Sequence, residues 1–211
     1  DGKDPSELSR KDEIFISDSG LISIAGGKLT GYRKMAHRAI DAVLDTLSEK
    51  RKKKLKKSST EKIALVTPLL NSSKEVGIYQ KEIESQLINK EFSVIDSKYY
   101  AWYLVTTYGK NTAFIMDKVA FFNNEIPLKK LIRAEVWYCV YYEMTNSLAD
   151  FFIRRTGRLY FNIDSISEHL EVVIQDFKKY LDWDAKRVEQ EKEKMHLLLK
   201  DATTYYTEEF K

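Results

Sequence analysis

The stretch LISIAGGKLTGYR at Leu21–Arg33 carries the strongest structural signal in this sequence. A short apolar run is followed by Gly26 and Gly27, and then by the start of an amphipathic segment. This order predicts a strand, a tight turn and a helix. Paired glycines let a ligand approach bare backbone N–H groups, with the positive end of the helix dipole behind them. The pattern favours a site for an electron-rich group such as a phosphate.

The alternative is a plain tight turn that packs a strand closely against a helix. Lys28 favours the ligand-binding interpretation, because a lysine at a helix start opposes the dipole unless an anion is near. Thr30 offers a hydroxyl in the same turn. Arg10 precedes this region and alone would be a surface arginine. If the chain folds back, Arg10 and Lys28 meet in a cationic pocket suited to a phosphate.

The residues around the diglycine predict a β-hairpin and one helix. Glu13–Ser17 and Leu21–Ala25 are apolar runs separated by a polar pair and Gly20, which is typical of a hairpin. A helix is expected over residues 31–47, because apolar residues recur there at helical spacing. That apolar stripe consists of Ala36, Ile40, Val43 and Leu47.

Helix signals dominate the rest of the chain, and no internal repeat is present. Capping or starting residues precede each apolar stripe, and Gly109 ends one of them. The expected starts are Ser72, Asp96 or Ser97, Pro127, Ser165 in a capping box with Glu168, and Asp184. The sequence therefore predicts a mainly α fold, with a hairpin and helix in front of a helical bundle that begins near residue 72.

Composition excludes several classes of protein. The chain has 211 residues with 43% hydrophobic residues, enough for a real core, and only 8 Gly and 3 Pro, which disfavours a β-sandwich. The 35 basic and 32 acidic residues are too balanced for a nucleic-acid surface. No apolar run reaches the ~18–20 residues of a membrane span. The basic run at Ser48–Thr60 reads as a solvated surface segment, with a localisation signal or an anionic-surface contact as alternatives.

Few other residues point to chemistry. Cys139 stands among apolar neighbours, which predicts a buried thiol, and a chain with one cysteine has no internal disulfide, as is typical of the cytoplasm. The three histidines lack partners at metal-ligand spacing, so no metal site is expected. The sequence contains no catalytic-triad, P-loop or GxGxxG motif. We expect the charged residues of Arg133–Glu135 and Arg154–Arg155 to form ion pairs, such as Glu143 with one of the two arginines.

Three segments resemble the FAD-dependent glycerol-3-phosphate dehydrogenase family. SGLISIAGGKLTGYRKMAHRAID at 19–41 resembles the end of its flavin domain. LIRAEVWYCVYYEMTNSLADFFIRRTGRLYF at 131–161 and YLDWDAKRVEQEKE at 180–193 resemble its helical C-terminal cap domain. The segment at about 48–97 is similar to an insertion of the alpha-glycerophosphate oxidases of low-GC Gram-positive bacteria.

The resemblance implies that FAD oxidises glycerol 3-phosphate to dihydroxyacetone phosphate. It places the turn of Gly26, Gly27, Lys28, Leu29 and Thr30 against the flavin, with the Lys28 side chain toward the substrate pocket. Arg10, in SRKDE, would bind the substrate phosphate. Oxygen, reduced to hydrogen peroxide, is the expected electron acceptor, and a quinone is the alternative.

The resemblance also implies a division of the chain. Residues 1–47 would end a split FAD-binding domain, 48–71 would be a flexible basic insertion, and 72–211 would form the cap domain. Asp1 stands where a methionine would start a protein, so we expect a piece of a longer chain whose N-terminal FAD-binding half is its partner. Alone, this piece is expected to hold no FAD and to be inactive.

The alternative is a protein of another functional class: a non-enzymatic helical interaction module that binds through the basic residues Arg51–Lys57. A homo-oligomer and a peripheral membrane contact stay open, whereas no nucleic-acid partner is expected.

Overall fold

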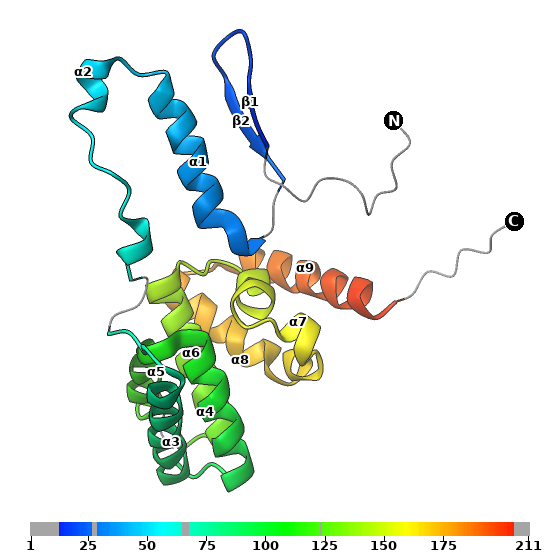
Figure 1. Cartoon of the computed structure of the whole chain (residues 1–211). Coiled ribbons are helices and arrows are strands. Elements are labelled where there is room, and N and C mark those ends of the chain that lie inside the picture. The colour runs from blue at the N-terminus through cyan, green and yellow to red at the C-terminus, as the bar shows by residue number, and fades with distance from the viewer. Residues whose placement is uncertain (1–12, 27–28, 65–67, 123, 205–211) are drawn as a thin grey trace, which may run out of the picture. The chain divides into compact units, whose positions relative to one another are not determined.

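The computed structural model describes residues 13–26, 29–64, 68–122 and 124–204. The chain divides into two compact units, residues 1–65 and residues 66–211. Helices account for most of the described residues, and the described strands are confined to one hairpin (Figure 1). The predicted mainly α fold is thereby confirmed.

The first unit begins with the predicted hairpin. β1 (Glu13–Ile16) pairs antiparallel with β2 (Ile22–Ala25). The turn between them closes at Gly20, whose N–H donates to the carbonyl of Ser17 at 2.9 Å. The φ angle of Gly20 is +85°, a conformation that favours glycine. The sequence signal of a polar pair followed by glycine therefore located this turn correctly.

The helix after the diglycine is α1 (Tyr32–Asp45), which packs against β2 and lies beside it in Figure 1. A 3₁₀ turn, η2 (Leu29–Gly31), leads into it. Among the described residues of this unit no side chain is fully buried. The predicted apolar stripe is uncovered, with Ile40 57% and Val43 40% exposed. The first unit therefore has no hydrophobic core of its own among its described residues.

The basic segment follows α1. A single turn, α2 (Glu49–Lys52), is followed by an irregular stretch and by η3 (Thr60–Lys62). Basic side chains from Lys50 to Lys57 are exposed, apart from the half-buried Lys52. Strong mutual repulsion of like charges keeps such a run solvated, in agreement with the expected surface segment.

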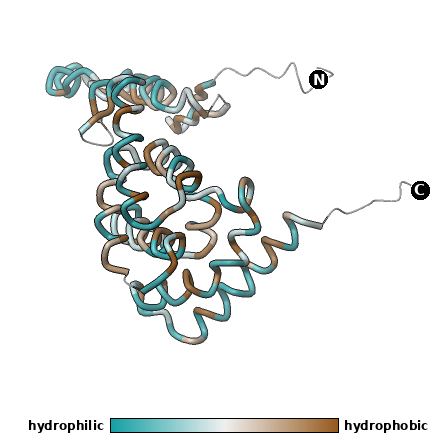
Figure 2. The backbone as a smooth tube through the Cα atoms, turned by 90° about the horizontal axis from the view of Figure 1, so that it is seen from below, coloured by the Kyte–Doolittle hydropathy of each residue, from teal (hydrophilic) through white to brown (hydrophobic). Residues whose placement is uncertain are grey.

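The second unit is a helical bundle. Its elements are α3 (Ser73–Asn89), α4 (Val94–Tyr108), η4 (Gly109–Asn111), α5 (Thr112–Val119), α6 (Pro127–Glu143), η5 (Asp150–Arg155), α7 (Arg158–Phe161), α8 (Asp164–Leu181) and α9 (Ala185–Thr203). α3 packs against α4, and α6 packs against both α5 and α8. Hydrophobic residues recur along these helices, as the brown segments of Figure 2 show.

The core of this unit is built largely of aromatic and branched side chains. Phe151, Phe152 and Phe177 are completely buried, as are Leu104 and Ile132. Each such side chain contributes about 1.5–3 kcal/mol relative to its exposed state. Unlike the described residues of the first unit, those of the bundle thus include a folding core.

Several helix ends match their sequence signals. The hydroxyl oxygen of Ser72 and the carboxylate of Asp184 accept hydrogen bonds from backbone N–H groups at the starts of α3 and α9. Pro127 occupies the first turn of α6, and Gly109, with φ +56°, ends α4. These residues satisfy or remove backbone groups that a helix leaves without partners at its ends.

Two predicted caps are wrong. α4 begins one turn earlier than expected, because Ser93 and not Asp96 or Ser97 accepts the capping N–H; it also donates to the Asp96 carboxylate at 2.7 Å. Ser165 lies inside α8, where its hydroxyl donates to the Asn162 carbonyl at 2.7 Å. The S-x-x-E pattern does not distinguish a cap from a helix-internal serine when an upstream residue already starts the helix.

The segment after α6 adopts a π-helix, which the sequence did not predict. In η5 the N–H of Thr156 donates to the carbonyl of Phe151 at 3.0 Å, and its hydroxyl donates to the same oxygen at 2.8 Å. The wider turn places Phe151 and Phe152 in the core together. Short π-helices are uncommon and frequently occur near functional sites.

Candidate functional site

The strand β2 precedes the glycine pair and η2 and α1 follow it, in the predicted order. Gly26 has a φ of +85°, so the chain turns at a position that disfavours a side chain. Leu29 and Thr30 follow in η2 and are exposed, Leu29 by 90%. Gly27, Lys28 and Arg10 lie outside the described residues, so their predicted roles stay predictions.

The start of α1 is suited to an anionic or electron-rich group. Its N-cap residue, Gly31, has no side chain, and no acidic residue stands in the first turn. Arg33 and Lys34 are basic residues in that turn. The positive end of a 14-residue helix is therefore not neutralised by a side chain of its own first turn.

A groove of about 980 Å³ runs beside α1 in the first unit. Its apolar lining comes from two segments, and basic side chains of both segments line it as well. The apolar residues are Tyr32, Ala36, Ile40, Leu44, Leu55 and Ile63, and the basic residues include Arg33, Lys56 and Lys57. An exposed apolar face of this kind is typical of a surface that binds another protein, a membrane or a ligand.

The second unit contains a buried polar cluster that the sequence did not reveal. Glu135 on α6 is completely buried, and Nη2 of Arg158 donates to its Oε2 at 3.1 Å. The hydroxyls of Tyr103 and Tyr108 donate to Oε1 of the same carboxylate. Ser165 accepts from Nη1 of Arg158 at 3.2 Å. Every charge in the cluster thus has an opposite charge or hydroxyl partner.

Burial and charge shift the titration of this cluster. Burial, and then the Glu135 carboxylate, raise the pKa of Tyr103 and Tyr108 well above the usual range. Burial alone would lower the pKa of Arg158, but its pairing with Glu135 raises it overall. All three groups therefore keep their protons, and the two hydroxyls act as donors.

The expected ion pairs of Arg133 and Glu135 are present. Glu135 pairs with Arg158, whereas Nη2 of Arg133 lies 2.6 Å from Oδ1 of Asp176 on α8 and its Nη1 donates to Glu125 at 2.8 Å. Such pairs form between opposite charges that the packing of the helices brings together, and spacing along the sequence does not reveal them.

The predicted pairing of Glu143 is correct for one arginine. Glu143 pairs with Arg155, whereas Arg154 pairs with Asp150 one turn away at 2.6 Å. Consecutive helical residues point in different directions, so only one of the two arginines reaches Glu143.

Metal and thiol chemistry receive no support from the described residues. No group of three or more metal-ligating side chains gathers among them. Cys139 is completely buried, as predicted, and burial raises the pKa of its thiol, with Glu135 adding to the effect. His169 is also buried, on α8. Within the described part of the chain, no helix is long and apolar enough to cross a membrane.

A small cavity of about 150 Å³ is a second feature that the sequence analysis missed. Aromatic residues of α4 and the segment following the π-helix line it. The run YYAWY at 99–103 could have indicated it, because residues three and four apart share a helix face.

Comparison with known proteins identifies the family. The profile described as the C-terminal domain of alpha-glycerophosphate oxidase matches residues 76–188, which is more than half of the chain. The chain belongs to this family. The hairpin, the diglycine turn and α1 precede the matched range.

Individual relatives extend over nearly the whole chain. An aerobic glycerol-3-phosphate dehydrogenase of Bacillus subtilis is 38% identical over 205 residues, and one of Staphylococcus haemolyticus is 32% identical over 212. Each alignment covers 96% of this chain but 36% of the relative. The chain thus spans about a third of the length of these relatives.

A solved structure is similar as well. The glycerol-3-phosphate dehydrogenase from Bacillus halodurans, complexed with FAD, matches with a TM-score of 0.74 and 30% identity. The match covers 93% of this chain and 39% of that one.

These comparisons correct one expectation. Residues 76–97 belong to the matched family domain, so the segment at about 48–97 is not an insertion throughout. The structural reason is that α3 and α4 supply core residues such as Ile83, Leu87 and Leu104.

Proposed function

We propose that this chain forms part of an FAD-dependent enzyme that oxidises sn-glycerol 3-phosphate to dihydroxyacetone phosphate. The observation that carries the proposal is the extent of the similarity to the FAD-complexed dehydrogenase. The 7% of this chain outside that match amounts to about 15 residues, far fewer than the 65 residues of the first unit. The likeness therefore includes most of the unit that holds the diglycine turn, beyond the helical domain.

The described residues at the turn fit a flavin. Gly26 presents backbone without a side chain, and the start of α1 carries neither an acidic residue nor a side-chain cap. Bound FAD would accept two electrons from the alcohol carbon of the substrate. The amides near Leu29 and Thr30 would stabilise the negative charge that reduction brings to the ring edge, since a helix N-terminus favours an anion.

We assign the substrate contacts to two basic residues. Lys28 would extend from the turn into the substrate pocket, and Arg10 would hold the phosphate through its two-pronged guanidinium. The proposal concerns binding and orientation: fixed cations place the phosphate so that the alcohol carbon faces the oxidant.

Oxygen is the proposed electron acceptor, with hydrogen peroxide as its product. The family's description as an oxidase domain supports this choice. The relatives named aerobic dehydrogenases make a quinone the alternative. Peroxide formation by the assembled enzyme in air separates the two.

The exposed apolar face of α1 supports the proposal that the first unit binds a further protein surface. We propose that this surface is the FAD-binding part found in the longer relatives, so residues 1–47 complete a flavin domain, 48–71 link it, and 72–211 form the cap. Assembly into a homo-oligomer and a peripheral contact of this cytoplasmic enzyme with a membrane belong to the same proposal.

A chimera tests the function. Residues 1–211 replace the segment that they match in the Bacillus subtilis relative. We expect the chimera to retain flavin absorbance, and glycerol 3-phosphate to bleach it under anaerobic conditions. Lys28→Ala should slow this bleaching about tenfold or more, because a charged contact to the substrate is lost. Lys50→Ala, on the exposed surface of α2, is the matched control.

The outcomes are distinct. A chimera that folds but holds no flavin, while the parent does, contradicts the proposed function. Flavin retention with an unaffected Lys28→Ala variant contradicts only the role of Lys28. Reversing the charges of Lys52–Lys54 should leave bleaching unchanged; if it abolished binding to an anionic partner instead, the interaction-module alternative would be favoured.

A further inference from the structure

Positive charge is concentrated in the first unit. Residues 1–65 include 15 basic and 10 acidic residues, whereas residues 66–211 include 20 basic and 22 acidic ones. The first unit therefore has an excess of positive charge, and the second has a slight excess of negative charge. A field of this kind acts on charged ligands beyond the range of direct contact.

Most of the positive excess comes from one short stretch. Residues 50–57 include seven basic residues and no acidic one, and we call this stretch the basic segment. Its basic side chains are exposed except for Lys52, which is half-buried and whose Nζ lies 3.4 Å from Oε1 of Glu49. Because like charges crowd together there, the basic segment attracts anions.

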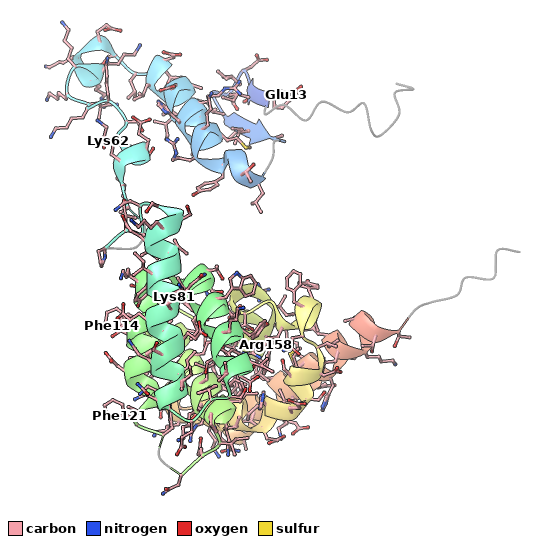
Figure 3. All side chains as sticks on the ribbon, turned by 60° about the horizontal axis from the view of Figure 1, so that its bottom comes forward. Glu13, Lys62, Lys81, Phe114, Phe121 and Arg158 are labelled. Atoms are coloured by element: carbon pink, nitrogen blue, oxygen red, sulfur yellow. The ribbon has the colours of Figure 1, made fainter. Side chains whose placement is uncertain are left out.

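The basic segment runs back along α1 toward the start of that helix. Lys56 and Lys57, at the end of the segment, line the same groove as Tyr32 and Arg33, which begin α1. Figure 3 shows the chain leaving α2 and returning beside α1 to the labelled Lys62. The end of the basic segment and the helix start that follows the glycine pair therefore share one groove.

The attraction expected here comes from the summed field of the segment rather than from one contact. Asp41 and Glu61 also line the groove, so they offset most of the charge of Arg33, Lys56 and Lys57. The remaining cations of the basic segment act from a greater distance. Salt screens such an interaction over about 8 Å at physiological ionic strength and over about 30 Å at 0.01 M, so the attraction depends on salt.

We propose that the basic segment draws the anionic substrate toward the start of α1 and so lowers the substrate concentration needed for half-saturation. The inference rests on the proposed function, because the phosphate of glycerol 3-phosphate carries about 1.5–2 negative charges at pH 7. The attraction acts before the chemical step, so it changes binding and leaves the limiting rate of flavin reduction unaltered. Since many weak contributions add, neutralising one lysine changes it little.

Stopped-flow bleaching of the chimera with the Bacillus subtilis relative tests the proposal. Lys56→Glu/Lys57→Glu reverses two charges of the basic segment. At about 0.01 M ionic strength it should raise the half-saturating concentration of glycerol 3-phosphate about threefold or more, with the limiting bleaching rate unchanged. The difference should vanish near 1 M salt, where screening acts within about 3 Å. Lys56→Arg/Lys57→Arg keeps both charges and should match the parent chimera.

Lys186→Glu/Lys194→Glu on α9 is the matched control, because it changes the net charge equally but on exposed positions of the second unit. It should leave the half-saturating concentration unchanged. An effect as large as that of Lys56→Glu/Lys57→Glu would assign the attraction to net charge alone and overturn the proposal. A lower limiting rate, or no response to the reversal at low salt, would overturn it as well.

Two further outcomes have separate meanings. If Lys56→Glu/Lys57→Glu abolished sedimentation with phosphatidylglycerol vesicles and left half-saturation unchanged, the basic segment would bind a membrane surface and the proposal would be wrong. A chimera that holds no flavin contradicts the proposed function, whereas one that bleaches normally without any dependence on the basic segment contradicts only this inference.

Discussion

Arg158 donates to Glu135 across 3.1 Å in the interior of the second unit, and the two residues lie on different helices, α7 and α6. Two tyrosine hydroxyls complete the carboxylate's partners. A buried charge pair of this kind is costly to break from one side, because the remaining charge keeps its desolvation penalty without its partner.

Glu135→Gln should therefore lower the free energy of unfolding by about 3–5 kcal/mol. Urea denaturation followed by tryptophan fluorescence measures the second unit directly, because Trp102, Trp137 and Trp183 all lie in it. Glu143→Gln on the same helix breaks the more exposed pair with Arg155 and should cost no more than about 1 kcal/mol. Equal losses in the two variants would contradict the importance of burial.

Acid should destabilise the second unit through His169. Burial, reinforced by the charge of Arg158, lowers the pKa of this histidine in the folded chain. The unfolded chain then binds a proton more readily than the folded one, so the free energy of unfolding falls as the pH drops through the unfolded pKa of about 6.5. The free energy of unfolding stops falling once the pH is below the pKa of His169 in the folded chain.

His169→Gln should flatten this pH dependence, whereas His196→Gln on the exposed face of α9 should leave it unchanged. Urea denaturation at a series of pH values gives both comparisons. An unchanged slope in His169→Gln would assign the acid sensitivity to other groups.

Cys139 should be unreactive in the folded chain. Its thiol is buried, and burial together with Glu135 raises its pKa, so little thiolate forms and reagents cannot reach it. Modification by a disulfide reagent should be as slow as opening of the bundle and should accelerate with urea. Rapid stoichiometric reaction in native buffer would contradict this arrangement.

Two glycines should respond to alanine in opposite directions. Gly157→Ala meets both a positive φ and the ring of Phe161, and should destabilise the bundle by about 1–3 kcal/mol. Gly77→Ala on α3 meets no atom within 4 Å and should stabilise it by about 0.5–1 kcal/mol. Thermal melts of both variants check the prediction. A stabilising Gly157→Ala would show that the turn can relax.

Local sequence signals predicted local structure well. The hairpin around Gly20, the cap at Asp184 and the helix start at Pro127 depend on neighbours in the chain, and all three are present. The π-helix at Asp150–Arg155 has no comparable local signal, because it is selected by packing of two adjacent phenylalanines into the core.

The same difference between local and long-range signals applies to the candidate functional residues. The glycine pair was visible in the sequence because it stands between a strand signal and a helix signal, and β2 and α1 flank it; its role in binding stays a prediction. The partners of Glu135 were not, since Tyr103, Tyr108 and Arg158 lie 23 to 32 residues away along the chain. Such contacts arise only when helices assemble, and spacing along the chain does not encode them.

The uncovered face of α1 has a consequence for biogenesis. Without a fully buried side chain among its described residues, the hairpin–helix segment gains little from collapsing alone, whereas the bundle can collapse as soon as it is synthesised. The segment would then fold last, when a surface that covers Ile40 and Val43 binds it. Until then, the amide protons of β1 and β2 should exchange rapidly with deuterium. Slower exchange at these positions would therefore show when the segment has folded.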